Sequence, residues 1–585
     1  MANRLNINEF IPTSADEVKK RGWKELDVIL FTGDAYIDHP SFGIAIIARL
    51  LEKKGLRVAV VPQPNWRDDL RDFKKLGKPN LFFGVTAGNM DSMVNHYTAN
   101  KRLRSDDAYT PGNKAGFRPD YATIVYTKIL KQLFPEVPVL LGGIEASMRR
   151  LTHYDYWSDT LKPSILVESG ADILVYGMAE KSVDMLTDFF ISDKKIENIK
   201  NINQIAYLID KTTFISNYNS SEYIILNSYE DCKESKIKFA LNFKAIEENS
   251  NSLNPKYLIE PYGEKYIVAN PAYPPLSEKE MDEIYDLPFT RLPHPRYFKK
   301  QPIPAYEMIK NSVVIHRGCF GGCSFCTISA HQGKFISSRS ESSILNELKK
   351  ITNSNGFKGH ISDLGGPSAN MYKMHGFDKE KCMKCKRPSC LYPNVCKNLN
   401  INHTPLLNLY KKARSLNKIN KITIGSGIRY DLFLNENGTF IDESGKDYFY
   451  QLLKYHVSGR LKVAPEHTSE KVLKLTRKPS FKLFETLYKI FYNINRKYSL
   501  NLQLIPYFIS GLPDCDIAEM KFLTKKMEML NIKPEQVQLF TPTPMTLASV
   551  MYYTEMDPYT LKKIYIAKDK NERDRQHQIF FWYKK

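Results

Sequence analysis

Residues 311–328 read Asn-Ser-Val-Val-Ile-His-Arg-Gly-Cys-Phe-Gly-Gly-Cys-Ser-Phe-Cys-Thr-Ile. The β-branched run Val313–Ile315 predicts a short buried strand that leads into a glycine-rich loop. That loop carries Cys319, Cys323 and Cys326 in the spacing C-x3-C-x2-C. Three thiolates can hold three irons of a [4Fe–4S] cube and leave the fourth iron open, whereas a closed structural zinc site needs a fourth ligand. The stretch therefore indicates an iron–sulfur cluster with one open iron.

The loop resembles the cluster loop of radical S-adenosylmethionine (SAM) enzymes, in which an aromatic residue, here Phe325, precedes the last cysteine. The flanking residues His316–Cys319 and Thr327–Ile328 are more narrowly similar to YgiQ-type radical SAM proteins, a family without an established reaction. The resemblance implies that the three cysteines bind the cluster and that Phe325 packs near the adenine of SAM. It also implies reductive cleavage of SAM to a 5′-deoxyadenosyl radical, with an electron donor such as flavodoxin or ferredoxin. A structural zinc loop or three reduced core cysteines are the alternatives.

Composition indicates a globular chain of several domains. The 585 residues are 42% hydrophobic and 12% aromatic, and no run of eighteen apolar residues predicts a membrane span. Residues 1–6 lack the apolar core of a signal peptide, so we expect a cytoplasmic protein. The net charge of +20 permits an RNA partner, but lysine is spread along the chain without an arginine-rich tract, so RNA is not favoured.

Nine cysteines occur, and seven of them fall into two tight groups, which favours metal ligation in a reducing compartment over disulfides. The second group lies in a Lys- and Asn-rich insertion over residues 370–400 and consists of Cys382, Cys385, Cys390 and Cys396. Four thiols this close together predict a second metal site, either structural zinc or an auxiliary iron–sulfur cluster. Such a site would hold the substrate pocket together or relay electrons. Metal-free cysteines are the alternative.

The N-terminal part, residues 1–190, alternates strands and helices and predicts a doubly wound parallel sheet. The expected strands are 26–31, 56–61, 80–85, 138–143 and 171–177. This layout resembles the cobalamin-binding-like domain that precedes many radical SAM barrels. A cobalamin loop would read Asp-x-His-x-x-Gly, whereas here His39 directly follows Asp38 and Gly43 comes four residues later. This departure argues against cobalamin, and we expect a structural or substrate-side lid.

Residues 191–310 predict an elaboration, exposed over 190–260, followed by a proline-rich connector. From 311 to 545, repeated strand–helix units predict a partial (β/α)6 radical SAM barrel with its chemistry at the carboxyl ends of the strands. Residues 546–585 form a short C-terminal extension. The expected barrel strands are 312–316, 359–364, 421–426, 460–464, 502–510 and 536–541, and the expected helices are 341–353, 405–417, 446–456, 469–495 and 516–530.

Glycine and polar residues follow the expected barrel strands. By resemblance to the superfamily, Gly365 and Gly366 bind the amino group of SAM, and Ser426, Arg429 and Glu466 contact its remaining polar groups. The alternative is that these residues have structural roles. The glycines would then form tight turns, Glu466 would be an acidic residue at the N-terminus of the next helix, and Arg429 would pair with a nearby carboxylate. No catalytic residue for the substrate is predicted.

The sequence therefore predicts a radical SAM enzyme but does not indicate its substrate. One alternative is a methylthiotransferase-like modification of RNA or protein, suggested by the preceding α/β domain and the basic charge. Another is a non-catalytic iron–sulfur protein that binds RNA or acts as a sensor. Detection of 5′-deoxyadenosine discriminates the enzyme from the sensor.

Overall fold

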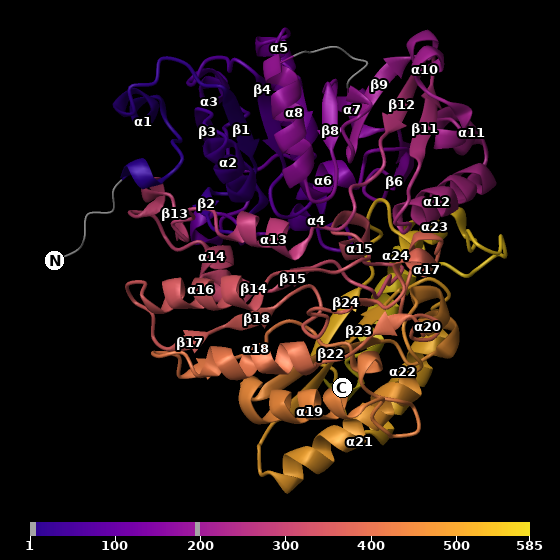
Figure 1. The fold of residues 1–585 in the computed structure, drawn as a ribbon. Helices are drawn as coiled ribbons and strands as arrows, with labels where there is room; N and C mark the ends of the chain where they lie inside the picture. Colours follow the sequence, from indigo (N-terminus) through magenta and orange to yellow (C-terminus); the bar gives the residue numbers. More distant parts are fainter. Residues whose placement is uncertain (1–6, 193–198, 585) are drawn as a thin grey trace. The chain divides into compact units, whose positions relative to one another are not determined.

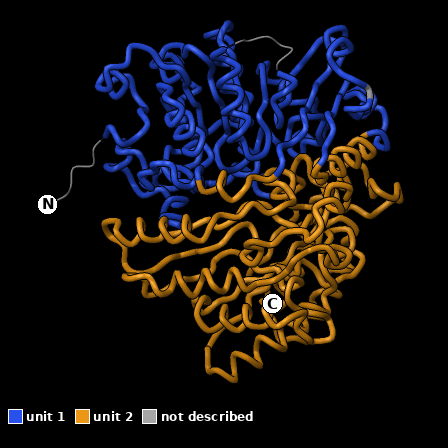
Figure 2. Tube along the Cα trace, in the orientation of Figure 1, with its two compact units in different colours: residues 1–238, 254–274, 283–310 blue, residues 239–253, 275–282, 311–585 orange. Residues whose placement is uncertain are grey.

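The computed structural model describes residues 7–192 and 199–584. Residues 1–6, on which the absence of a signal peptide is argued, lie outside this part. Figure 2 shows two compact units, of which the first comprises residues 1–238, 254–274 and 283–310. The second comprises residues 239–253, 275–282 and 311–585. The longest segment of the second unit thus begins at residue 311, where the sequence predicts the start of the barrel.

Unit 1 is built on one sheet in which the strand order is β10-β11-β12-β9-β8-β5-β4-β1-β3 (Figure 1). Its five predicted strands are present and pair in parallel: β1 (Val28–Thr32), β3 (Val58–Pro62), β4 (Phe82–Thr86), β5 (Val139–Leu141) and β8 (Ile173–Val175). Because β1 lies between the second and third of these strands, the chain reverses its winding direction beside β1. That reversal marks the topological switch point of a doubly wound sheet.

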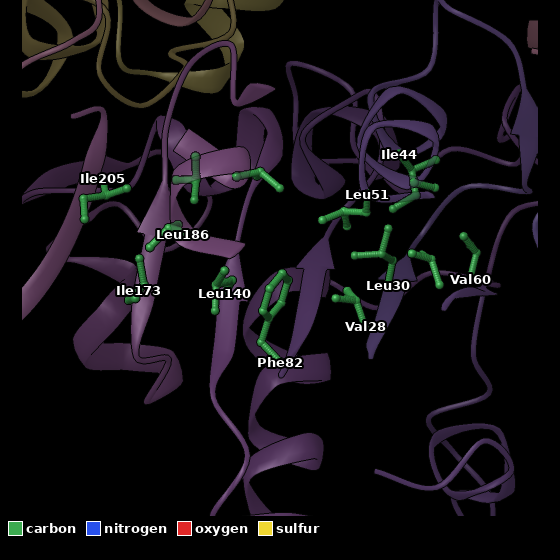
Figure 3. Packing of buried hydrophobic residues seen from close by; sticks show 14 of the residues in the cluster. Val28, Leu30, Ile44, Leu51, Val60, Phe82, Leu140, Ile173, Leu186 and Ile205 are labelled. Atoms are coloured by element: carbon green, nitrogen blue, oxygen red, sulfur yellow. The ribbon is translucent and has the colours of Figure 1, made fainter. Parts of the chain in front are cut away.

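Helices cover the sheet of unit 1. Helix α2 (Gly43–Lys53) packs on α8 (Glu180–Ser192), and α5 (Ala122–Leu133) packs on α3 (Arg71–Lys74) and α7 (Ile165–Ser169). Figure 3 shows apolar side chains of α2 and α8 packed on those of the strands. Among the described residues of unit 1, the other α-helices are α1 (Ala15–Lys20), α4 (Ser92–His96), α6 (Gly143–Ser147), α10 (Lys211–Asn217), α11 (Tyr229–Glu234) and α14 (Pro304–Ile309).

Over the described residues 199–260 the expectation of an exposed elaboration is wrong, because strands from this part of the chain extend the sheet, while residues 193–198 lie outside the described part. The added strands are β9 (Ile205–Asp210), β10 (Tyr223–Ile225), β11 (Tyr257–Tyr262) and β12 (Lys265–Ala269). Strand β9 runs antiparallel to both β8 and β12. Its residues Ile205, Ala206, Tyr207 and Ile209 are buried. The Lys, Asn and Ser residues around this short apolar run give the whole segment a polar composition.

In unit 2 the predicted strands form three separate groups of parallel strands. Strand β14 pairs with β18, β17 pairs with β21, and β23 pairs with β22 on one side and β24 on the other. Their bounds are β14 (Ser312–Val314), β17 (His360–Ile361), β18 (Asp363–Gly365), β21 (Lys421–Ile422), β22 (Arg460–Glu466), β23 (Gln503–Ser510) and β24 (Gln536–Leu539). These strands occupy the six expected stretches of sequence. The α/β fold class with a barrel after an N-terminal sheet is confirmed.

The helices of unit 2 depart from expectation at two points. The predicted helix 469–495 is two helices, α20 (Glu470–Thr476) and α21 (Phe481–Lys497). Arg477 adopts a left-handed conformation with φ of 56°, and Pro479 follows it, so the first helix ends there. The predicted helix 446–456 begins earlier, as α19 (Glu443–Gln451), and ends in a π-helical turn. The other long helices are α16 (Glu341–Thr352), α18 (Thr404–Arg414) and α22 (Ile517–Met529).

Two further parts complete unit 2. Helix α12 (Lys236–Ser250) contributes its residues from Phe239 onward, and α13 (Glu278–Tyr285) occupies a proline-free interval of the proline-rich passage. The C-terminal extension forms α23 (Leu547–Thr554) and α24 (Lys570–Ile579), and α24 packs on α22 and β24. Within residues 7–192 and 199–584, no helix is long and apolar enough to cross a membrane.

Candidate functional site

The loop with the three cysteines follows β15 (His316–Arg317), which pairs antiparallel with β16 (Ser337–Ser338). The backbone N–H of Cys319 donates to the carbonyl of Gly333 at 3.2 Å, and that of Cys326 donates to the carbonyl of Cys323 at 3.1 Å. All three cysteines are half-buried. The return strand and these bonds therefore hold the loop in a defined shape.

Arg429 lies against this loop. Its Nη1 donates to the sulfur of Cys323 at 3.4 Å, and its Nε donates to Oδ1 of Asp431 at 2.9 Å. Burial, the largest single effect, would raise the pKa of Asp431, but the charge and hydrogen bonds of Arg429 together with the charge of Lys478 lower it below its usual value. A Cβ on Gly321 would stand 2.7 Å from Nη1 of Arg429, so glycine allows the approach. Arg429 thus pairs with a nearby carboxylate, as the alternative interpretation of the sequence expected. It also contacts the cluster loop.

Two polar residues that the sequence analysis missed support this arrangement. Asn370 accepts from the N–H of Arg429 at 2.8 Å and donates to the carbonyl of Arg429 at 2.9 Å. Ser368 has its hydroxyl 3.5 Å from the sulfur of Cys319. Both residues follow the Gly365-Gly366 pair in the chain. Their position after the end of a predicted strand was the only feature of the sequence that could have marked them as site residues.

The predicted glycine pair ends β18 and lies beside a second predicted residue. A Cβ on Gly365 would stand 2.9 Å from the hydroxyl oxygen of Ser426, and a Cβ on Gly366 would stand 2.5 Å from the ring of His316. Asp363 holds Ser426, since its Oδ2 accepts the hydroxyl at 2.6 Å. Its Oδ1 accepts from the backbone N–H of Gly425 at 2.8 Å. Two strand ends are thereby joined by one carboxylate.

Glu466 closes β22 as a buried residue with φ of 68°, which is a left-handed conformation. Its Oε1 lies 3.5 Å from Nζ of the buried Lys478. Burial raises the pKa of Glu466, and Lys478 partly offsets that effect. Burial also raises the pKa of the Cys326 thiol to about 12, with smaller contributions from Cys323, Cys319 and Glu466. Phe325 is half-buried in the turn between the last two cysteines.

The residues of the loop fit a [4Fe–4S] cluster. Within residues 7–192 and 199–584, no three His, Cys, Asp or Glu side chains converge closely enough to enclose a single metal ion. Thiolates that bind separate irons of a cube stand farther apart than ligands of one ion, so a three-cysteine loop does not need that convergence. The donor set is soft sulfur on a loop in which Gly318 and Gly322 have positive φ and closely approach the neighbouring backbone.

The second cysteine group lies in the predicted insertion. Cys382 is on α17 (Lys379–Met383), and the remaining three cysteines follow it in loops. All four are half-buried. The backbone N–H of Cys390 donates to the carbonyl of Phe320 at 3.0 Å, which brings this group against the first cysteine loop. Part of both groups packs on one apolar cluster that includes Phe320 and Leu391.

The switch point of unit 1 is filled by its own polar side chains. Asp34, after β1, accepts from the N–H of Asn89, after β4, at 2.7 Å, and Arg118 lies 2.9 Å from its other oxygen. A Cβ on Gly88 would stand 2.1 Å from Asp34. Burial raises the pKa of Asp34 to about 6, and the Arg118 charge opposes that rise. His39, the histidine of the altered motif, is buried, and its Nδ1 accepts from the N–H of Ser41 at 3.1 Å.

Three family models match consecutive parts of the chain: Radical SAM N-terminal over residues 10–312, Radical SAM superfamily over 313–523, and a domain of unknown function, DUF3362, over 535–585. A UPF0313 protein of Porphyromonas gingivalis is 56% identical, and the match covers 100% of this chain and 92% of that protein. The chain belongs to the UPF0313 family. Similar UPF0313 proteins are those of Bacteroides thetaiotaomicron (55% identical, 99% of this chain, 94% of that protein) and Clostridium botulinum strain Okra (44%, 98%, 87%).

The UPF0313 family is the YgiQ family, so the resemblance drawn from the sequence is confirmed. This UPF0313 protein is a radical SAM enzyme of unknown substrate, and its fold implies a [4Fe–4S] cluster and SAM. The Radical SAM superfamily match begins at residue 313, inside β14, and contains both cysteine groups.

Two solved radical SAM enzymes have weaker likenesses to this UPF0313 protein. The methyltransferase TsrM from Kitasatospora setae, with cobalamin and a [4Fe–4S] cluster bound, is 13% identical, with a TM-score of 0.47 over 89% of this chain and 77% of that chain. The cobalamin-dependent enzyme OxsB is 11% identical, with a TM-score of 0.48 over 92% of this chain and 58% of that chain. Neither likeness bears on which ligand this UPF0313 protein binds, so the argument against cobalamin stays a prediction.

Proposed function

We propose that Cys319, Cys323 and Cys326 hold a [4Fe–4S] cluster at which SAM is cleaved reductively. When bound, the cluster supplies an electron to the sulfonium of SAM, which yields methionine and a 5′-deoxyadenosyl radical. The observation that carries the proposal is the contact between Arg429 and the sulfur of Cys323. It adds a buried cation, held in place by Asp431, to a loop of soft donors.

The chain's own residues would orient SAM and exclude water. Gly365 and Gly366 let the side chains of Ser426 and His316 pack closely against the end of β18, where we expect backbone groups to bind the amino acid end of SAM. Asp363 fixes Ser426, and Lys478 balances the charge of Glu466. These residues act by position, since none is assigned a proton transfer. Phe325, half-buried between two cysteines, is proposed to contact the adenine.

We propose unit 1 as a lid or structural domain rather than a cobalamin domain. Asp34 and Arg118 occupy the switch point, which is where doubly wound sheets bind ligands. His39 lies in a motif altered from the cobalamin pattern. We further propose a cytoplasmic enzyme that receives electrons from a donor such as flavodoxin or ferredoxin. RNA is not the favoured partner.

The test uses the full chain, purified without oxygen and reconstituted with iron and sulfide. Dithionite and SAM are added, and 5′-deoxyadenosine and methionine are quantified by mass spectrometry. We expect both products in the wild type and neither in Cys319→Ala, while Cys232→Ala, which removes a buried thiol of unit 1, behaves as the wild type. A Cys319→Ala protein that keeps a reducible cluster and cleaves SAM contradicts the proposal.

The same assay addresses the alternatives. A wild-type cluster that is reduced by dithionite without any SAM cleavage supports the sensor hypothesis. Salt-dependent tRNA binding would support RNA modification, because phosphate contacts release counterions. Cell extract added to a turnover mixture with labelled SAM identifies the substrate class.

A further inference from the structure

The hairpin of β19 (His375–Gly376) and β20 (Leu399–Asn400) closes the loop that contains the second cysteine group. Asn398 ties the ends of this loop: its Oδ1 accepts from the N–H of Asp378 at 2.9 Å, and its Nδ2 donates to the sulfur of Cys382 at 3.3 Å. A Cβ on Gly376 would stand 2.5 Å from the same sulfur. The side chain of Cys382 is therefore held by groups that leave little room for any larger residue.

The four cysteines of this loop are linked in two pairs by backbone hydrogen bonds. The N–H of Cys385 donates to the carbonyl of Cys382 at 3.2 Å, and the N–H of Cys396 donates to the carbonyl of Cys390 at 2.7 Å. Cys390 and Cys396 both pack on the apolar cluster that includes Phe320 and Leu391. Two adjacent turns that each present a pair of cysteines are typical of tetrathiolate metal sites.

A buried lysine lies beside these thiols. Lys334 is 1% exposed, and its Nζ donates to the carbonyl of Arg387 at 2.7 Å and lies 4.7 Å from the centre of the Phe335 ring. Arg387 stands between Cys385 and Cys390 in the chain, so the ammonium is bonded to the cysteine-rich segment itself. A buried ammonium is costly without a negative partner, and neutral thiols supply no charge. Four thiolates around a divalent metal or a cluster carry net negative charge and would compensate Lys334.

The cysteine-rich segment is bonded to the first cysteine loop. Ser389 donates its hydroxyl to the carbonyl of Gly321 at 2.7 Å, and the N–H of Cys390 donates to the carbonyl of Phe320 at 3.0 Å. A Cβ on Gly322 would stand 2.4 Å from the carbonyl oxygen of Pro388. The segment between Cys385 and Cys390 therefore lies directly on the backbone between Cys319 and Cys323.

We propose that Cys382, Cys385, Cys390 and Cys396 bind a second thiophilic metal centre that stabilises the loop of the first cluster. The centre is a zinc ion or an iron–sulfur cluster, since both take four thiolates. Binding replaces the four thiol protons, which are released to solvent. In the described part of the chain these sulfurs do not converge on one point, so binding requires the loop residues Cys385, Cys390 and Cys396 to turn toward the fixed Cys382.

The test measures zinc, iron and sulfide in the full chain, purified anaerobically, by elemental and sulfide analysis. We expect about one zinc ion beyond the four irons of the first cluster, or about eight irons in total. The double variant Cys382→Ser/Cys385→Ser loses that zinc ion or the second set of irons. Cys319→Ala/Cys323→Ala loses the first cluster but keeps the second centre, which separates this proposal from the proposed function. Cys232→Ser is the matched control. Four irons without zinc in the wild type overturn the proposal.

A second measurement uses only the wild-type protein, so it tests the proposal even if the double variant fails to fold. Native wild-type protein is alkylated with iodoacetamide before and after chelation, and each cysteine is mapped by mass spectrometry. We expect the four cysteines to be protected before chelation and reactive afterwards. Amide hydrogen exchange over residues 319–323 should become faster at the same time, because the segment that supports this loop loses its anchor. Equal alkylation with and without chelator, together with unchanged exchange, excludes the second centre.

Discussion

Nη1 of Arg429 lies 3.4 Å from the sulfur of Cys323, although the two residues are 106 positions apart in the chain. The guanidinium is held at its other edge by Asp431 and through its backbone by Asn370. The cluster loop therefore has a fixed, buried cation at one of its thiols. A cation beside a cluster favours the reduced form, which carries one more negative charge.

Replacing Arg429 should lower the reduction potential of the cluster. We expect Arg429→Gln to keep its iron but to be reduced at a potential lower by about 60 mV, a tenfold change in the one-electron equilibrium. Redox titration followed by electron paramagnetic resonance measures the shift. The double variant Arg429→Gln/Asp431→Asn also removes the carboxylate that Arg429→Gln leaves unpaired. It should recover the free energy of unfolding but keep the lowered reduction potential. Arg414→Gln, on α18, is the control, and an unchanged potential in Arg429→Gln would count against the role of this cation.

Gly366 should tolerate no side chain. In Gly366→Ala the new Cβ would stand 2.5 Å from the His316 ring, so the ring or the strand end must move. Because misplacement by about 1 Å can cost a hundredfold in rate, we expect SAM cleavage to fall by about 10- to 100-fold. Gly427→Ala is the matched control, since its Cβ would meet no atom within 4 Å. Equal rates in the two variants would show that the space beside Gly366 is not used.

The ion pair of Arg477 and Glu247 should stabilise the cluster loop. Arg477 donates from both terminal nitrogens to the carboxylate at 2.7 and 2.8 Å, and its Nη1 lies 3.4 Å from the carbonyl oxygen of Gly322. Glu247→Gln leaves the Arg477 charge buried and unpaired, so we expect a loss of about 3 kcal/mol in the free energy of unfolding of unit 2. Denaturant unfolding measures this loss.

Glu535→Gln is the control for that pair. It breaks an ion pair with Arg460 in which the two side chains are 55% and 47% exposed, for Arg460 and Glu535 respectively. Exposed pairs contribute at most about 1 kcal/mol. If Glu247→Gln costs no more than Glu535→Gln, the Arg477 pair is not a support of the loop.

Glu260 should make the stability of unit 1 depend on pH. The carboxyl is buried and accepts the hydroxyl of Thr152 at 2.9 Å, and burial raises its pKa from 4.5 to about 7. Between these values the folded protein keeps a proton that the unfolded chain releases, so the free energy of unfolding falls as the pH rises, by about 3 kcal/mol in all. Glu230 and Cys232 face the same carboxyl.

Melting temperatures between pH 4.5 and 8 measure this dependence. Glu260→Gln should flatten the curve and be the more stable protein at pH 8, because an amide has no proton to lose. Glu264→Gln, in the adjacent turn with its side chain 96% exposed, should retain the wild-type curve. A Glu260→Gln protein with the same pH dependence as the wild type would exclude this carboxyl as its source.

The sequence by itself determined the local features. Strands β1, β3, β5 and β8 are buried on both faces, so continuous apolar runs such as Val28–Phe31 mark them without tertiary information. The spacing of Cys319, Cys323 and Cys326 lies within one loop and is visible for the same reason. The barrel strands could be predicted because strand-like and helix-like stretches alternate along residues 311–541.

Only the tertiary structure decided which distant groups meet. Arg429 with Cys323, Asp363 with Ser426, and Glu247 with Arg477 are pairs that no local periodicity encodes. Strands β9 to β12, which pair in both parallel and antiparallel fashion, were missed because polar residues surround their short apolar runs, and sheet pairing depends on contacts remote in sequence. Local propensity acts over a few residues, whereas a site forms where packing brings separate strand ends together. The cysteine spacing thus predicts the cluster, and the packing of the barrel supplies its neighbours.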